Sequence, residues 1–166
     1  MTSEQPHSSL ISAELDPHFG EHGLTHLQSP DPNFPNYVTF VIGTGPDNMT
    51  YIAGQAGGLN HSIYTLTRLD ENGLIDTSFG KQGYFYDWFY GSDRSHFYAE
   101  QMVFAHGKIL LTGHLFHDGI DGLRKDKAVV CILPDGRIDE GFGEGGEIHF
   151  PCAKRERRFA SGNDLQ

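Results

Sequence analysis

The sequence predicts an all-β protein made of antiparallel sheets. Glycine accounts for 21 of its 166 residues, nearly twice the usual share of about 7%. Aromatic residues make up 12% of the chain. Runs of Val, Ile, Thr and aromatic residues between glycine-bearing turns are typical of short strands. A nine-residue pattern that occurs three times indicates that these strands are organised in repeats.

The pattern is apolar-Asp-x-x-Phe-Gly-x-x-Gly, and it occupies residues 15–23, 75–83 and 138–146. Its three Asp residues lie 60 and then 63 positions apart. Each position has a structural role in a tight corner. The Asp side chain can accept backbone N–H groups of the next turn, the Phe can fill an apolar gap, and the Gly can adopt a positive φ. We expect this structural role for Asp16, Phe19, Gly20, Asp76, Phe79, Gly80, Asp139, Phe142 and Gly143.

Strands are predicted between and after these corners. They are expected at residues 37–42, 49–54, 62–69, 84–89, 101–105, 108–113, 128–133 and 147–150. The connections are too short for crossover helices, so the pairing should be antiparallel. Four such strands in every sixty residues correspond to the blade of a β-propeller. The expected fold is therefore a partial β-propeller of antiparallel four-stranded, blade-like repeats, with about two blades in the chain.

The second occurrence of the pattern, with its preceding residues 68–83, resembles the delta-60 repeat of bacterial proteins. Residues 131–143 are similar, with Cys131 where the second unit has Arg68. The resemblance covers roughly residues 10–150. It implies a β-propeller and carries no catalytic residues with it.

The expected organisation has three parts. Residues 1–9 form a disordered tail, residues 10–150 form the repeat domain, and residues 151–166 form a basic, flexible tail. Within the domain, one unit spans about 24–83 and the next about 84–146. Propellers have four or more blades, so two units would leave sheet faces and edges uncovered. We expect several copies to assemble into a ring. A compact two-sheet sandwich and a piece of a longer propeller are the alternatives.

Composition limits the partners. The chain has 12 Lys and Arg against 22 Asp and Glu, a net charge of −10, which argues against nucleic acid as the main partner. No apolar run is long enough to span a membrane. The first residues lack the features of a signal peptide, which indicates a cytoplasmic protein, although export without a signal stays open. Cys131 and Cys152 form no CxxC motif, and two buried free thiols are expected rather than a disulfide.

Residues 84–98 are the most unusual segment, since eight of these fifteen residues are aromatic. Alternation along a strand would place Tyr86, Trp88 and Tyr90 on one face, with Arg94 nearby. This combination suits a ligand site or a protein interface. Packing between blades is the alternative explanation for the same residues.

No catalytic residue, metal site or cofactor is predicted. Residues 70–76 resemble the beginning of a calcium loop but lack its later ligands. His114 and His117 are three positions apart, so on a strand they would point to opposite faces. We therefore expect a non-enzymatic binding or scaffolding module that partners itself as a homo-oligomer, with a protein or a glycan as a further candidate partner. A carbohydrate-binding lectin with sites between blades, and a hydrolase or lyase on a propeller scaffold, are the alternatives.

Overall fold

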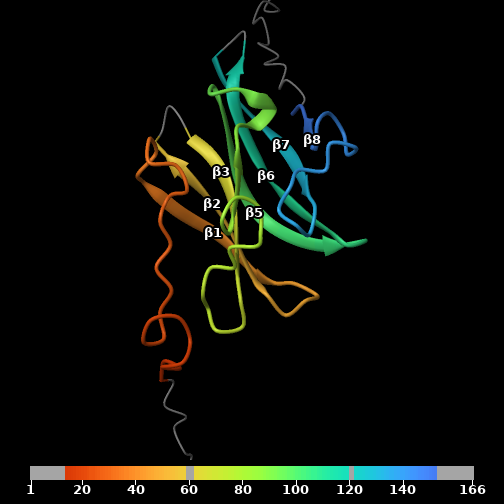
Figure 1. The fold of residues 1–166 in the computed structure, drawn as a ribbon. Helices are drawn as coiled ribbons and strands as arrows, with labels where there is room; N and C mark the ends of the chain where they lie inside the picture. The colour runs from red at the N-terminus through yellow and green to blue at the C-terminus, as the bar shows by residue number, and fades with distance from the viewer. Residues whose placement is uncertain (1–13, 59–61, 120–121, 153–166) are drawn as a thin grey trace, which may run out of the picture.

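The computed structural model describes residues 14–58, 62–119 and 122–152, and these form two four-stranded antiparallel sheets (Figure 1). In both sheets the strands follow one another in chain order. The first sheet contains β1 (Tyr37–Thr44), β2 (Thr50–Gly57), β3 (Ser62–Leu69) and β4 (Tyr84–Asp87). The second sheet contains β5 (Ser95–Ala105), β6 (Lys108–Gly119), β7 (Gly122–Ile132) and β8 (Glu147–Phe150). The expectation of an all-β chain with antiparallel four-stranded units is confirmed.

The two sheets share local details. Each has a break in register at the same place, between Thr39 and Val41 in β1 and between Ala99 and Gln101 in β5. A glycine of the neighbouring strand lies beside each break, where the two backbones come too close for a side chain. A Cβ on Gly113 would lie 1.9 Å from a backbone oxygen of β5, and a Cβ on Gly54 would lie 2.3 Å from a backbone oxygen of β1. In each sheet, the corner pattern comes between the third strand and the fourth, so β4 and β8 each follow a corner.

The core lies between the two sheets. Phe79 is fully buried there and packs edge-on against Tyr51, with ring centroids 5.8 Å apart. Tyr64 packs edge-on against Phe97 of the second sheet at 5.6 Å. The buried residues that form this cluster are Tyr51, Ala53, Tyr64, Leu66, Phe79, Phe85, Phe89, Phe97, Ala99, Ile109, Leu111, Leu115, Ala128, Val130 and Ile132. Burial of this much apolar surface is the main stabilising term of the fold.

Residues 14–36, which we call the N-terminal segment, lie along the other face of the first sheet (Figure 1). The hydroxyl of Thr25 donates a hydrogen bond to the Gly73 carbonyl oxygen at 2.6 Å, and Phe34 packs edge-on against Trp88 at 5.4 Å. On this face, Ile63 and Leu69 of β3 are buried, whereas Ile42 of β1 is 70% exposed. The N-terminal segment therefore covers this face at β3 and leaves part of β1 exposed.

The opposite face of the second sheet, which we call its outward face, is only half-buried. The residues on it include Leu110, Thr112, His114, Phe116, Val129 and Ile148. The described residues leave it open to solvent. The two sheets therefore differ in how far the face that points away from the core is covered.

Several details differ from the sequence-based expectation. Strands β5, β6 and β7 are 11, 12 and 11 residues long, well beyond the predicted segments. Strand β4 ends at Asp87, because residues Phe89–Gly91 form a 3₁₀ turn in which Tyr90 has a φ of 52°. The predicted alternation of aromatic faces therefore ends at that turn.

Both cysteines are free, as expected, but only Cys131 is buried and Cys152 is exposed. The expectation that both thiols are buried is therefore wrong for Cys152. The described residues contain no helix long and apolar enough to cross a membrane. Residues 1–9 and nearly all of the predicted C-terminal tail lie outside the described residues.

Candidate functional site

The three corners have the same hydrogen-bond pattern. In each corner, the Phe N–H donates to the Asp carbonyl oxygen, and the last Gly N–H donates to the Phe carbonyl oxygen. In each, the Asp side chain also accepts the backbone N–H two residues later, at 2.9, 3.0 and 3.3 Å for His18, Ser78 and Gly141. The Asp residues therefore stabilise the turn, as a local Asp turn does in general. The Gly after each Phe has a positive φ, as in Gly20, Gly80 and Gly143.

The first two corners dock on the hairpin turn of the next unit. The Gly20 N–H donates to the Asn72 carbonyl oxygen at 2.6 Å, and the Gly80 N–H donates to the Asp135 carbonyl oxygen at 2.8 Å. Glycines in the receiving turns permit this approach. A Cβ on Gly73 would lie 2.7 Å from the Phe19 ring. The same contact between units is therefore made twice.

The third corner has no such neighbour in the part of the chain that the structure describes. Gly143 has a φ of 58°, close to those of the other two corners, but its N–H has no backbone acceptor among the described residues. Phe142 is half-buried, whereas Phe79 in the second corner is fully buried. Among residues 14–58, 62–119 and 122–152, this corner is therefore the one of the three that is not docked on a turn.

Arg68 connects the second corner to the following unit. Its Nε donates to Asp76 at 2.7 Å, and its Nη1 donates to the Pro134 carbonyl oxygen at 3.0 Å. Its guanidinium lies over the Phe79 ring, 5.0 Å from the centroid. Hydrogen bonds from Ser78 and Arg68 lower the pKa of Asp76 despite partial desolvation.

In the next unit, Cys131 replaces Arg68, and the cation comes from a different strand. Lys108, at the start of β6, forms the ion pair with Asp139. Lys108 is more exposed than Arg68, with 42% of its side chain accessible. The spacing of the repeat gave no indication of this replacement, because Lys108 lies outside the corner pattern.

Three of the four predicted site residues line two neighbouring grooves. Trp88 and Tyr90 line a groove of about 750 Å³, which we call the Trp88 groove, together with Asp87, Ile138, Glu140, Glu144 and Glu147. Tyr86 lines the adjacent groove of about 620 Å³, which shares Asp87, Ile138 and Glu140 with the first. Both grooves lie where β4 and its turn meet the third corner. Aromatic rings beside several carboxylates can bind a polar ligand that has an apolar face.

Glu147 is the most buried carboxylate of the Trp88 groove, with 4% of the residue exposed. It accepts a hydrogen bond from the Tyr64 hydroxyl at 2.7 Å and one from the Tyr90 N–H at 2.5 Å. Burial raises its pKa above the ordinary value, although these hydrogen bonds oppose the change. Since both oxygens are engaged, the arrangement supports a structural role and not proton transfer to a ligand.

Arg94 lies elsewhere, in a groove of about 720 Å³ on the outward face of the second sheet. Tyr98, Glu100, His114 and Phe116 also line it. Glu100 bridges His114 at 2.6 Å and Lys127 at 2.8 Å. The structure therefore separates Arg94 from Tyr86, Trp88 and Tyr90.

His114 and His117 lie on opposite faces of β6, as the spacing predicted. His117 Nε2 lies 2.8 Å from a carboxylate oxygen of Asp126, which is itself buried. Burial alone would raise the pKa of Asp126. Hydrogen bonds from His117 and from the Cys152 N–H outweigh burial and lower it.

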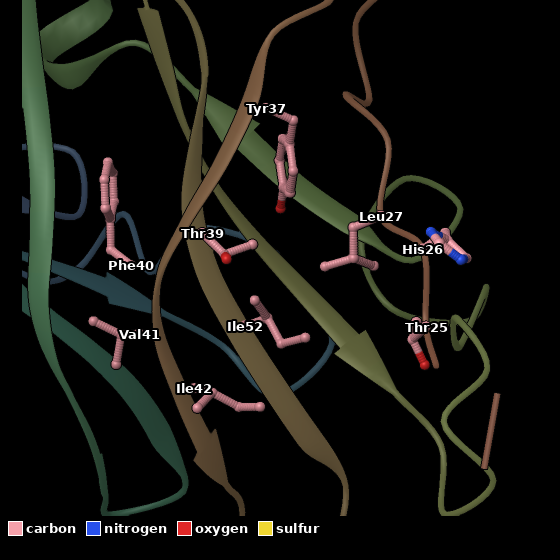
Figure 2. Close-up of a pocket in the computed structure, with 9 residues that line it drawn as sticks. All are labelled: Thr25, His26, Leu27, Tyr37, Thr39, Phe40, Val41, Ile42 and Ile52. Atoms are coloured by element: carbon pink, nitrogen blue, oxygen red, sulfur yellow. The ribbon is translucent and has the colours of Figure 1, made fainter. Parts of the chain in front are cut away.

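A further cavity of about 450 Å³ separates the N-terminal segment from the first sheet (Figure 2). Thr25, His26 and Leu27 line it on one side, and Tyr37 and Ile52 are among the lining residues of the sheet. Figure 2 shows Leu27 pointing toward the sheet and His26 pointing away from it. The segment therefore covers the sheet without filling the space beneath it.

Within residues 14–58, 62–119 and 122–152, no group of three or more His, Cys, Asp or Glu side chains is placed to hold a metal ion. No family model, curated protein or solved structure matches the chain.

Proposed function

We propose that this chain is a non-enzymatic binding or scaffolding module made of delta-60-type, propeller-like units, and that it works as a homo-oligomer. The open third corner is the observation that supports this proposal most directly. Two corners of the chain are docked on a following unit, and the third has the same geometry without a following unit among the described residues.

Exposed apolar side chains support the same proposal. Val38, Phe40 and Ile42 of β1 are 52%, 40% and 70% exposed. Strand β1 is also the edge of its sheet, since within the described ranges it pairs with β2 alone. Exposed apolar side chains and open strand edges are features through which proteins associate.

Light scattering coupled to size exclusion, together with native mass spectrometry, tests the proposal. The expected result is a mass larger than that of one chain at micromolar concentration or above. A folded protein that keeps the mass of one chain up to millimolar concentration would contradict it.

The Trp88 groove supports a second candidate, the binding of a glycan between units. Trp88 and Tyr90 offer aromatic surfaces, and Glu140 and Glu144 offer hydrogen-bond acceptors for sugar hydroxyls. On a glycan array, Trp88→Ala should abolish binding, whereas Tyr98→Ala in the other groove should leave it unchanged. If no glycan binds and Trp88→Ala only lowers the mass of the assembly, the groove is an interface between copies.

A further inference from the structure

The outward face of the second sheet corresponds position by position to the face that the first sheet uses to pack on the second. Strand pairing sets this correspondence, since Leu110 pairs with Cys131 as Tyr51 pairs with Arg68. By the same pairing, Val129 corresponds to Leu66. Tyr51 and Leu66 are buried against the second sheet, whereas Leu110 and Val129 are half-exposed. The second sheet therefore presents an unoccupied version of a surface that already binds a sheet within the chain.

The complementary surface lies at the other end of the stack. It is the face of the first sheet that carries Ile63 and Leu69, together with the turn at residues 70–73. In the chain, the N-terminal segment covers this surface, and its corner at residues 15–23 docks on Gly73. The segment therefore lies where the third corner of another copy would dock.

We propose that copies of this chain associate head to tail, and that the N-terminal segment is a displaceable cap on the receiving surface. The third corner and outward face of one copy dock on the turn at residues 70–73 and the first sheet of the next copy. This inference rests on the proposed function, since it names the surfaces through which the homo-oligomer forms.

The cap is packed less completely than the contact that it imitates. The 450 Å³ cavity lies beneath it (Figure 2). Phe19 in its corner is only half-buried, whereas Phe79 in the equivalent contact is fully buried. Leu15 and Leu24 are 63% and 49% exposed. A sheet that filled this space would bury more apolar surface than the cap does.

The cap has the advantage of being tethered. A tethered segment competes at an effective concentration in the millimolar range, so the cap should raise the protein concentration at which copies associate. Charge adds a second dependence. Glu140 and Glu144 of the third corner would approach Asp70 and Glu71 of the next copy, and salt screens such repulsion. Added salt should therefore lower the concentration at which copies associate.

Two variants separate the cap from the docking corner. Phe19→Ala combined with Thr25→Ala weakens only the cap, because it removes the ring that contacts Gly73 and the hydroxyl that bonds to it. Phe142→Ala weakens only the docking corner. Thr77→Ala is the control, because Thr77 is exposed in the second corner, which docks within the chain and lies outside both surfaces. Circular dichroism checks that each variant is folded.

The measurement is mass by light scattering against protein concentration. The cap variant should lower the midpoint of association at least about tenfold, the ratio that a 1.4 kcal/mol difference produces. Phe142→Ala should raise the midpoint by a similar factor, and Thr77→Ala should leave it unchanged. A synthetic peptide of residues 14–36 should dissociate the assembly of the unaltered chain, and the same peptide with Phe19→Ala should act more weakly.

The outcomes distinguish the inference from the proposed function. If the unaltered chain associates but neither variant nor peptide shifts the midpoint, the homo-oligomer stands and the head-to-tail inference is overturned. If only the cap variant associates, the inference is supported and the unaltered chain is not a homo-oligomer. If the folded cap variant keeps the mass of one chain at every concentration, the inference is overturned.

Discussion

The hydroxyl of Tyr64 in β3 donates a hydrogen bond of 2.7 Å to the buried carboxylate of Glu147 in β8. The contact links the first sheet to the outermost strand of the second, across 83 positions of sequence. Glu147 also accepts the N–H of Tyr90, which fixes the 3₁₀ turn after β4 against β8. The Glu147 side chain therefore connects β3 and the 3₁₀ turn to β8.

Glu147 should make stability depend on pH. Its pKa is raised above 4.5 in the folded chain by burial, so the folded state binds a proton more readily than the unfolded state. The stability that this group contributes is full below the unfolded pKa and declines as pH rises through the folded pKa. Glu147→Gln should therefore become more stable relative to the unaltered chain as pH rises from about 4 to 8. Urea unfolding at a series of pH values measures this difference, and parallel pH profiles would contradict it.

Asp126→Asn is the control of opposite sign. The pKa of Asp126 is lowered from 3.8, so its contribution is present above that value and is lost as pH falls through the folded pKa. The unaltered chain should therefore lose stability relative to Asp126→Asn as the pH falls below about 4, and the two should have parallel profiles at higher pH.

Phe79→Ala should destabilise the chain by about 3–5 kcal/mol, because it truncates a fully buried ring in the core. Phe142→Ala is the matched variant in the third corner, where the same pattern residue is half-buried. It should cost about 1–2 kcal/mol in the dissociated chain. Chemical denaturation at low protein concentration measures both, and equal losses would show that docking does not set the burial of the corner.

Gly136→Ala should disrupt the contact between the second corner and the following turn. Its Cβ would lie 2.4 Å from the backbone nitrogen of Gly80, at a residue whose φ is +82°. Gly145→Ala is the control, since φ there is +61° and no atom lies within 4 Å of the added Cβ. The control should cost about 1 kcal/mol for its backbone strain, and Gly136→Ala should cost clearly more. Comparable melting temperatures for the two variants would count against the docked contact.

Asp76→Ala and Asp139→Ala compare the two ion pairs. Both remove a turn cap worth about 1 kcal/mol. Asp76→Ala additionally leaves Arg68 without its carboxylate at a site where its side chain is only 14% exposed. Lys108 can return to water, so we expect Asp76→Ala to be the more destabilising by about 1–2 kcal/mol. Thermal unfolding of both variants tests this order.

The corners and most strand positions could be predicted from the sequence because they depend on local chemistry. The Asp side chain of each corner accepts a hydrogen bond from the backbone N–H two residues later. The Gly residues adopt the positive φ that the corner needs without contacts from distant residues. The long strands β5, β6 and β7 could not be recognised in full. Residues 114–127 contain His, Asp, Lys and Arg, which lower the apparent strand tendency, and pairing across the sheet decides their conformation.

The contacts between units could not be predicted for a different reason. Gly20 meets Asn72, and Arg68 reaches Pro134, so their partners are set by how the sheets stack. The replacement of Arg68 by Lys108 depends on strand pairing within the second sheet, because β6 lies beside β7 and brings Lys108 to Asp139. The sequence predicted that the aromatic residues of 84–98 share one face of a strand. In the structure, the turn at Tyr90 ends the strand and Arg94 lies in a separate groove, so the segment is divided between grooves.

Each sheet receives its outermost strand after the corner that ends the sixty-residue pattern, so the sequence unit and the sheet are offset by one strand. In evolutionary terms, duplication of one sequence unit in the gene would add a whole new sheet and leave the existing loops between strands unchanged. Growth or shrinkage by one unit would therefore preserve the fold of its neighbours, and homologous chains of different length could share one mode of stacking.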